Sequence, residues 1–271
     1  MKIALCFSGH IRDLNETKVF WTELIDKYNI DVYASFWDDE NKEKEDTINN
    51  FLTIYTPKKW EVERYDVFKQ TTQDIASMYV EPPSFFNQGL RTAAKEFRQI
   101  PMYYKIWRAN MLSKHIGIKY DLVIRARTDI VLDDNFEIKY NQMLNVPMGR
   151  IKAQVWNDSA SITDIFAYGT PKIMDYYSFV FLKAMEYQQA GHYMIPAEHL
   201  IHVHFKKIHI QIRSFPSYLL ITRVWKDAPH EYYNNYVSPA EESIECSDEK
   251  ELNINPAGTF VKDVKNEFKI D

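Results

Sequence analysis

The chain has 271 residues, which is enough for one large domain or two small ones. Its hydrophobic share of 45% and charged share of 26% are those of an ordinary globular protein. Its net charge of −5 argues against a dedicated nucleic-acid binder, because such proteins usually carry a basic excess.

The cysteines and the apolar segments indicate the cellular compartment in which the protein is expected. Cys6 and Cys246 are the only two cysteines, and so distant a pair predicts neither a disulfide framework nor a zinc site. The apolar start of the chain is too short for a signal peptide core, and no stretch reaches the roughly 18 apolar residues of a membrane span. We therefore expect a cytoplasmic protein without a transmembrane segment.

The first part of the chain predicts a β-α-β unit. Residues 2–8 form an apolar run that is typical of a buried strand, and residues 30–37 repeat that pattern. Between them, Asp13 and Glu16 have the spacing of a capping box, and apolar residues follow at helical spacing. A strand, a helix and a second strand in close succession predict that the two strands pair in parallel.

The rest of the chain alternates between predicted strands and helices. The charged segment 38–46 is interpreted as a solvated run. Further strands are expected at 60–62, 120–132, 149–156, 162–169 and 208–215. Helices are expected to begin near Pro101, at Thr170-Pro171 with an end at Gly191, and at Pro196. This order predicts a single α/β domain with a mostly parallel sheet over residues 1–237, followed by an acidic, polar tail at 238–271.

The segment 120–132 places charged residues within a strand pattern. Arg125, Arg127 and Asp129 occupy alternate positions, and arginine is seldom buried without a partner. One explanation is a local ion pair at the end of the sheet. The other is a ligand site, because ligands of open α/β sheets bind at the carboxyl ends of the strands. Two guanidinium groups suit a diphosphate, and Asp129 could hold a divalent metal together with phosphate oxygens.

The segment 7–13, FSGHIRD, has the same position relative to the first strand. Gly9 would let the backbone approach a ligand closely, and Ser8, Arg12 and the following helix N-terminus favour an anion. The segment matches neither the phosphate-binding loop nor the dinucleotide fingerprint. A simple turn is the alternative.

Five short motifs, taken together and in order, resemble those of a known family. They are SGHIRD at 8–13, DVYASFWDD at 31–39, YDLVIRARTDIVL at 120–132, DIFAYG at 164–169 and PAEHL at 196–200. This series resembles a family of GT-A-like glycosyltransferases that occurs in bacterial capsule clusters and in large DNA viruses, including viruses of Chlorella algae. The resemblance covers residues 1–225. It implies a GT-A-like, Rossmann-like sheet that is mostly parallel and flanked by helices.

The resemblance also implies a nucleotide-sugar donor, with a UDP-sugar expected, and a glycan or glycoprotein hydroxyl as acceptor. The residues implied to hold the donor are Ser8, Gly9, Arg12, Arg125, Arg127 and Asp129. The Arg-x-Arg-x-Asp segment stands where many GT-A enzymes carry an Asp-x-Asp metal motif, which implies Mn²⁺ or Mg²⁺ at Asp129. Two arrangements stay open. Either Asp129 holds a metal and both arginines assist, or the arginines hold the diphosphate and Asp129 orients them.

A glycosyltransferase also needs a group that faces the acceptor hydroxyl. Asp164 and Glu198 are the candidate catalytic carboxylates, and Asp158 is a third. Glu198 and His202 are four residues apart, so they could be a base and its orienting partner, two metal ligands, or one solvated helix face. Two later basic residues could contact phosphate or acceptor, Arg213 and Arg223.

Two other functions remain as alternatives. A sugar nucleotidyltransferase should show more acidic metal ligands and a glycine-rich, basic N-terminal loop, and this sequence has neither. A non-catalytic carbohydrate-binding protein of capsule or capsid assembly would keep the aromatic residues, which make up 15% of the chain. Such a protein needs no diphosphate site, so the Arg125 and Arg127 pair disfavours it.

Overall fold

A computed structural model describes most of the first two thirds of the chain and short pieces beyond. The described residues are 1–38, 42–71, 99–132, 136–147, 164–190, 192, 200–201, 203–205, 212–215, 220–221 and 243–244. Several sequence predictions lie outside the described residues: the strand at 149–156, the helix start at Pro196, and the site candidates Asp158, Glu198, His202 and Arg223.

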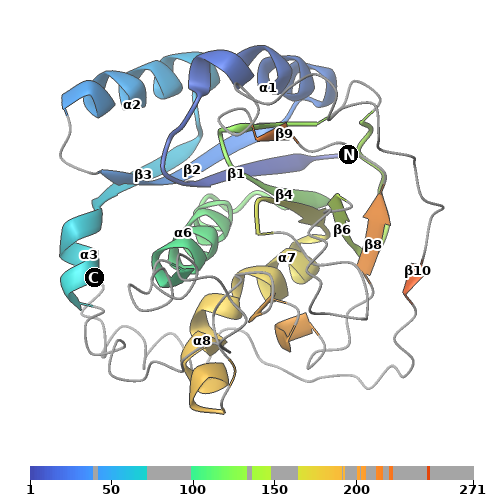
Figure 1. Cartoon of the computed structure of the whole chain (residues 1–271). Coiled ribbons are helices and arrows are strands. Elements are labelled where there is room, and N and C mark those ends of the chain that lie inside the picture. Colours follow the sequence, from blue (N-terminus) through green and yellow to red (C-terminus); the bar gives the residue numbers. More distant parts are fainter. Residues whose placement is uncertain are drawn as a thin grey trace, which may run out of the picture.

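A mixed sheet forms the centre of the molecule (Figure 1). The described residues supply eight strands, in the spatial order β10-β8-β6-β7-β4-β1-β2-β3. Their bounds are β1 Ile3–Gly9, β2 Asp31–Asp38, β3 Lys59–Arg64, β4 Leu122–Ala126, β6 Leu144–Pro147, β7 Phe166–Gly169, β8 Ile212–Phe215 and β10 Ser243–Ile244.

Most strand pairs of this sheet are parallel. Strand β1 pairs in parallel with both β2 and β4, and β2 pairs in parallel with β3. Strand β7 runs antiparallel between β4 and β6, β6 pairs in parallel with β8, and β10 is antiparallel to β8. The predicted parallel β-α-β unit and the mostly parallel α/β architecture are therefore confirmed.

Helices cover both faces of the sheet (Figure 1). The helices are α1 Leu14–Tyr28, α2 Lys42–Tyr55, α3 Tyr65–Thr71, α6 Gln99–Leu112, α7 Pro171–Ser178 and α8 Val180–Gln189. Side chains alternate along each strand, so Ile3, Leu5 and Phe7 enter the core under α1 and α2. Ala4 and Cys6 enter the second core, which α6, α7 and α8 cover.

The charged segment 38–46 contains the start of helix α2, so its interpretation as a solvated run was incomplete. The segment is rich in Glu and Lys, which are good helix formers, and the apolar side that packs inward begins only near Phe51. Strand β3 was expected at 60–62 and is confirmed there. Strand β6 was not predicted.

Two other predictions needed correction. The segment 120–132 is not one strand, because β4 ends at Ala126 and a turn follows. After that turn, β5 Ile130–Val131 pairs with β9 Leu220–Ile221 in a separate two-stranded sheet. The helix expected from Thr170 to Gly191 is divided into α7 and α8 at Phe179, although Thr170 is its N-cap and Pro171 opens it as predicted.

Within the described part of the chain, no helix combines the length and the apolar character that crossing a membrane requires.

Candidate functional site

The strand order creates a switch point between β1 and β4. The chain moves from β1 to β2 and β3 on one side, and it then returns to place β4 on the other side of β1. In open α/β sheets, ligands bind at the carboxyl ends of the strands where the order reverses in this way. The two segments that leave this point are 9–13 and 127–129, and they lie within the segments 7–13 and 120–132 that the sequence singled out.

Thr128 joins these two segments after the strand ladder has ended. Its hydroxyl accepts a hydrogen bond from the Arg12 backbone N–H at 2.9 Å and donates to the Arg12 carbonyl at 3.0 Å. The hydroxyl of Thr17, in the first turns of α1, donates to the Thr128 carbonyl at 2.6 Å. Arg12 and Arg127 are thereby held on the same edge of the sheet, although more than a hundred residues separate them in sequence.

Arg127 and Asp129 form a two-pronged ion pair within the turn. The Arg127 Nε donates to one Asp129 carboxylate oxygen at 2.8 Å, and an Arg127 terminal nitrogen donates to the other. Asp129 is buried, with 1% of its surface exposed, whereas 17% of the Arg127 side chain is exposed. The predicted local ion pair is present, and it fixes the plane of the partly buried Arg127 guanidinium.

Arg125 lies on β4 and is buried to 3% exposure on the face that α6, α7 and α8 cover. One terminal nitrogen donates to the Ile165 carbonyl, but among the described residues its Nε has no hydrogen-bond partner. Burial lowers the pKa of this guanidinium, and the nearby Tyr177 and Asp164 oppose that shift. A buried cation with an unused donor is costly to the free protein.

Ser8 presents a second unused polar atom close by. Its hydroxyl is buried, and within the described residues it finds no hydrogen-bond partner. Cys6 lies opposite Arg125, so Ser8, two residues on, points from β1 to the same face of the sheet as Arg125. Two orphaned polar atoms on adjacent strands indicate a place that a polar ligand or water would complete.

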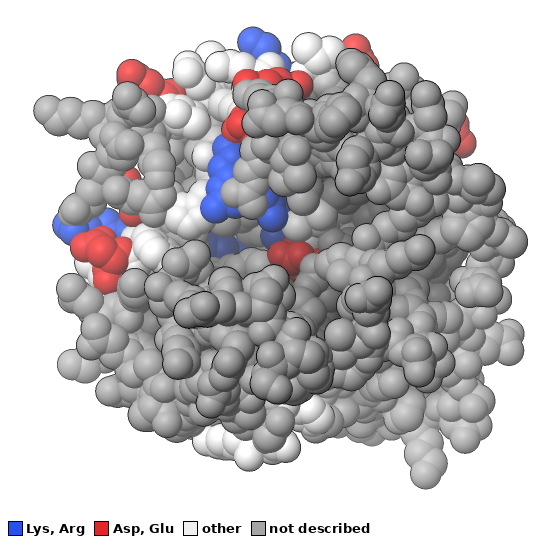
Figure 2. Space-filling model, viewed as in Figure 1, with Lys and Arg blue, Asp and Glu red and all other residues white. Residues whose placement is uncertain are grey.

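Gly9 ends β1 with a backbone conformation that suits glycine. Its φ is +104°, a value that side chains rarely tolerate, and a Cβ added there would meet no described atom within 4 Å. The described residues thus leave open space beside Gly9. Figure 2 shows a hollow on one face of the molecule in which Lys and Arg side chains gather, with acidic side chains beside them.

Asp164 is the candidate catalytic carboxylate that the structure brings to this edge. Strand β7 pairs antiparallel with β4, with Phe166 opposite Ala126, so the residues just before β7 lie beside the end of β4. Asp164 is half-buried and interacts electrostatically with Arg125. The other candidate, Glu198, lies outside the described residues, and of Arg213 the structure describes only the backbone, in β8.

The fit of a divalent metal at Asp129 can be judged from its carboxylate. Both oxygens accept hydrogen bonds from Arg127. Among the described residues, no group of three or more His, Cys, Asp and Glu side chains is arranged to hold a metal ion. In this arrangement the described residues do not fit a divalent metal at Asp129.

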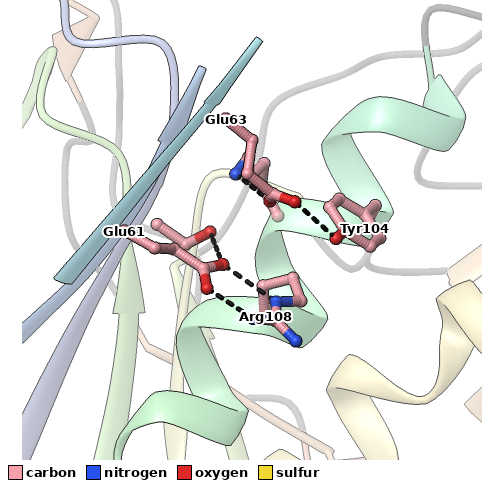
Figure 3. Close-up of polar contacts among 6 residues, drawn as sticks. Glu61, Glu63, Tyr104 and Arg108 are labelled. Carbon is pink, nitrogen blue, oxygen red and sulfur yellow. Dashed lines mark hydrogen bonds and ion pairs between the residues drawn. The ribbon is translucent and has the colours of Figure 1, made fainter. Parts of the chain in front are cut away.

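A second polar cluster lies beside the switch point, between β3 and α6 (Figure 3). The Glu61 carboxylate accepts hydrogen bonds from Arg108 and, at 2.7 Å, from Ser35. The Glu63 carboxylate accepts bonds from Lys105 at 2.6 Å and Tyr104 at 2.9 Å. We call these six residues the β3–α6 network.

The β3–α6 network balances two acids with two bases. The Lys105 side chain is fully buried, and its ammonium also lies 4.2 Å from the centre of the Trp37 ring. Burial lowers the pKa of Lys105, and the pairing with Glu63 opposes that shift. For Glu61, burial raises the pKa, but the bonds from Arg108 and Ser35 outweigh it and leave the value below normal.

Sequence reasoning missed the residues that connect the site. Thr128, Thr17 and the Ile165 carbonyl were not singled out, because a threonine or a backbone carbonyl carries no signal of its role until its partner is known. The only available hint was the position of Thr128 between Arg127 and Asp129.

The comparisons with models of known protein families and with curated proteins found no match for this chain.

Proposed function

We propose that this chain is a glycosyltransferase that moves a sugar from a nucleotide-diphosphate donor, with a UDP-sugar expected, to a hydroxyl of a glycan. One observation carries the proposal. At the switch point of the sheet, Ser8 Oγ and Arg125 Nε are buried, face the same way and find no partner among the described residues. A donor with phosphate oxygens would supply the acceptors that such groups lack.

The arginines would stabilise the leaving nucleotide diphosphate. Negative charge grows on that group as the bond to the sugar breaks, and fixed cations aimed at it lower the barrier. Arg127 is suited to this task because Asp129 already holds its guanidinium in one orientation, so little order is lost on binding. This pairing favours the arrangement in which Asp129 orients Arg127 and the arginines hold the diphosphate.

The acceptor side of the reaction is assigned to a carboxylate. Asp164 would take the proton of the acceptor hydroxyl, since it lies at the same sheet edge as the arginines and is only partly buried. Glu198 is the second candidate from the sequence. General-base assistance of this kind contributes about 10²–10⁴-fold to a rate.

Ligand binding tests the proposal first. Isothermal titration of the wild-type chain with UDP, GDP, CMP and their sugars, with Mn²⁺ and then with EDTA, should find one nucleotide that binds. Arg125→Met should weaken that binding by at least about tenfold, since a charged hydrogen bond contributes about 1.5–3 kcal/mol. Arg64→Met is the matched control, because Arg64 is an exposed arginine at the end of β3.

The results separate the competing functions. NMR of a donor panel with glycan acceptors should show sugar release or transfer. If no nucleotide binds, the transferase is excluded, and binding of glycans alone would then support the carbohydrate-binding protein. Pyrophosphate formed from a sugar phosphate and a nucleoside triphosphate would instead support the nucleotidyltransferase. If EDTA abolishes nucleotide binding, that result would support a divalent metal at Asp129.

A further inference from the structure

Thr128 occupies a special place in the candidate site, because its side chain joins the 9–13 segment to the turn that carries Arg127 and Asp129. The pairing of β1 with β4 ends at Phe7 and Ala126. Beyond that point the two segments have no ladder between them. Thr128 replaces the ladder with one side chain, since its hydroxyl both accepts from Arg12 and donates to Arg12.

The bond pattern leaves Thr128 little freedom. Its side chain is buried to 2% exposure, and its own carbonyl accepts the 2.6 Å hydrogen bond from Thr17. Helix α1 therefore fixes the backbone of Thr128, and Thr128 in turn fixes the backbone of Arg12. The residues on either side of Thr128 are Arg127 and Asp129, the ion pair of the site.

We propose that Thr128 is the positioning residue of the donor site, which sets the spacing between the 9–13 segment and the Arg127–Asp129 pair. This inference rests on the proposed function. Thr128 would touch no donor atom itself. It would keep the Gly9 backbone, the Arg12 side chain and the Arg127 guanidinium in one geometry before the donor arrives, which reduces the entropy lost on binding.

The test uses variants that differ by one hydroxyl or one methyl group. Thr128→Val keeps the shape of the side chain and removes both bonds to Arg12, whereas Thr128→Ser keeps both bonds. We expect Thr128→Val to raise the UDP dissociation constant and the donor KM by about tenfold or more, as misplaced groups do. Thr128→Ser should restore wild-type values, and the acceptor KM should not change in either variant.

Two further measurements keep the test decisive. Thr22→Val is the control, because the Thr22 hydroxyl bonds only within helix α1 on an exposed face. Hydrogen exchange of the Arg12 amide should become faster in Thr128→Val and stay slow in Thr128→Ser. If Thr128→Val does not fold, Thr17→Val serves in its place, because it removes the hydrogen bond that holds the Thr128 carbonyl. Thr17→Ser keeps that bond and is the matching rescue variant.

The outcomes distinguish this inference from the proposed function. Wild-type nucleotide affinity in Thr128→Val would overturn the positioning role and leave the transferase intact. Equal losses in Thr128→Val and Thr128→Ser would also overturn it, because the hydroxyl would then not be the cause. A wild-type chain that binds no nucleotide would overturn the proposed function and this role with it.

Discussion

Two polar regions lie next to each other on the same side of the sheet, and they are built on opposite principles. In the β3–α6 network, each acid has a base and further donors, and Lys105 is fully buried against its partner Glu63. At the switch point, Ser8 Oγ and Arg125 Nε are equally buried but lack partners among the described residues. The two regions meet on adjacent strands, because Ser8 on β1 is the register partner of Ser35 on β2.

Under the proposed function, polar residues of the first region stabilise the fold, and those of the second region gain their hydrogen-bond partners when the donor binds. In a satisfied buried network, hydrogen bonds and ion pairs offset the free-energy cost of desolvation without any ligand. Here they also fix how α6 packs on β3. An unsatisfied one costs stability until something binds, and such costs are typical of functional sites. Changes in the β3–α6 network should therefore affect stability, and changes at the switch point should affect binding.

The largest expected effect is on the β3–α6 network. Glu63→Gln removes the charge that faces the buried Lys105 ammonium. Because 37% of the Glu63 side chain is exposed, solvent screening keeps the expected cost at the lower end for a buried pair, about 3 kcal/mol. Urea unfolding measures this loss, while the folded fraction should bind nucleotide as the wild type does. Asp66→Asn is the control, because the Arg64–Asp66 pair is exposed and its loss should change stability little. A loss of nucleotide affinity in Glu63→Gln would erase the distinction between the two regions.

A second satisfied group extends the comparison to pH. His204 is buried, with Nδ1 2.7 Å from the Tyr187 hydroxyl and Nε2 2.6 Å from the Tyr176 carbonyl, and burial lowers its pKa to about 4. The unfolded chain takes up the proton near pH 6.5 and the folded chain does not, so stability falls as pH decreases from 6.5. The loss should reach about 3 kcal/mol at pH 4.

Urea unfolding between pH 7 and pH 4 measures the contribution of His204. The His204→Gln variant should lose less stability than the wild type over this range, because the carboxylates titrate in both proteins. Parallel pH profiles of the two proteins would show that His204 makes no such contribution.

Gly9→Ala probes the backbone of the switch point. At a φ of +104° an alanine is strained by about 2 kcal/mol even though a Cβ would meet no described atom within 4 Å. Its methyl group would also occupy the open space in which a ligand could approach. We expect lower stability together with weaker nucleotide binding. Gly117→Ala is the control, since Gly117 also has a positive φ but lies after α6, away from the switch point.

The smallest effect gives the sharpest comparison, because it uses two neighbouring serines. Ser35→Ala removes a donor to Glu61 and should cost about 1 kcal/mol of stability with unchanged nucleotide affinity. Ser8→Ala removes a buried hydroxyl without a described partner, so stability should stay constant or rise by up to about 1 kcal/mol while affinity falls. Stability that falls in Ser8→Ala would mean that this hydroxyl is satisfied after all.

Much of the fold could be predicted because it depends on local pattern. The strands at β1 and β2, the helix between them and their parallel pairing follow from apolar spacing over a few residues. Helix α2 was missed because its charged start resembles a solvated run. The end of β4 was missed because alternation continues through Arg127 and Asp129 although the backbone turns.

The sequence by itself determined that six candidate residues lie at or just beyond the carboxyl ends of two buried strands: Ser8, Gly9, Arg12, Arg125, Arg127 and Asp129. The sequence also offered the local Arg127–Asp129 ion pair as one of two explanations, and the structure shows that pair. Tertiary structure alone decided that these strands are neighbours and that Arg125 keeps an unused donor among the described residues. The physical reason is that burial and hydrogen bonding depend on segments more than a hundred residues apart. Thr128 shows this most clearly, since its role exists only because Arg12 lies beside it.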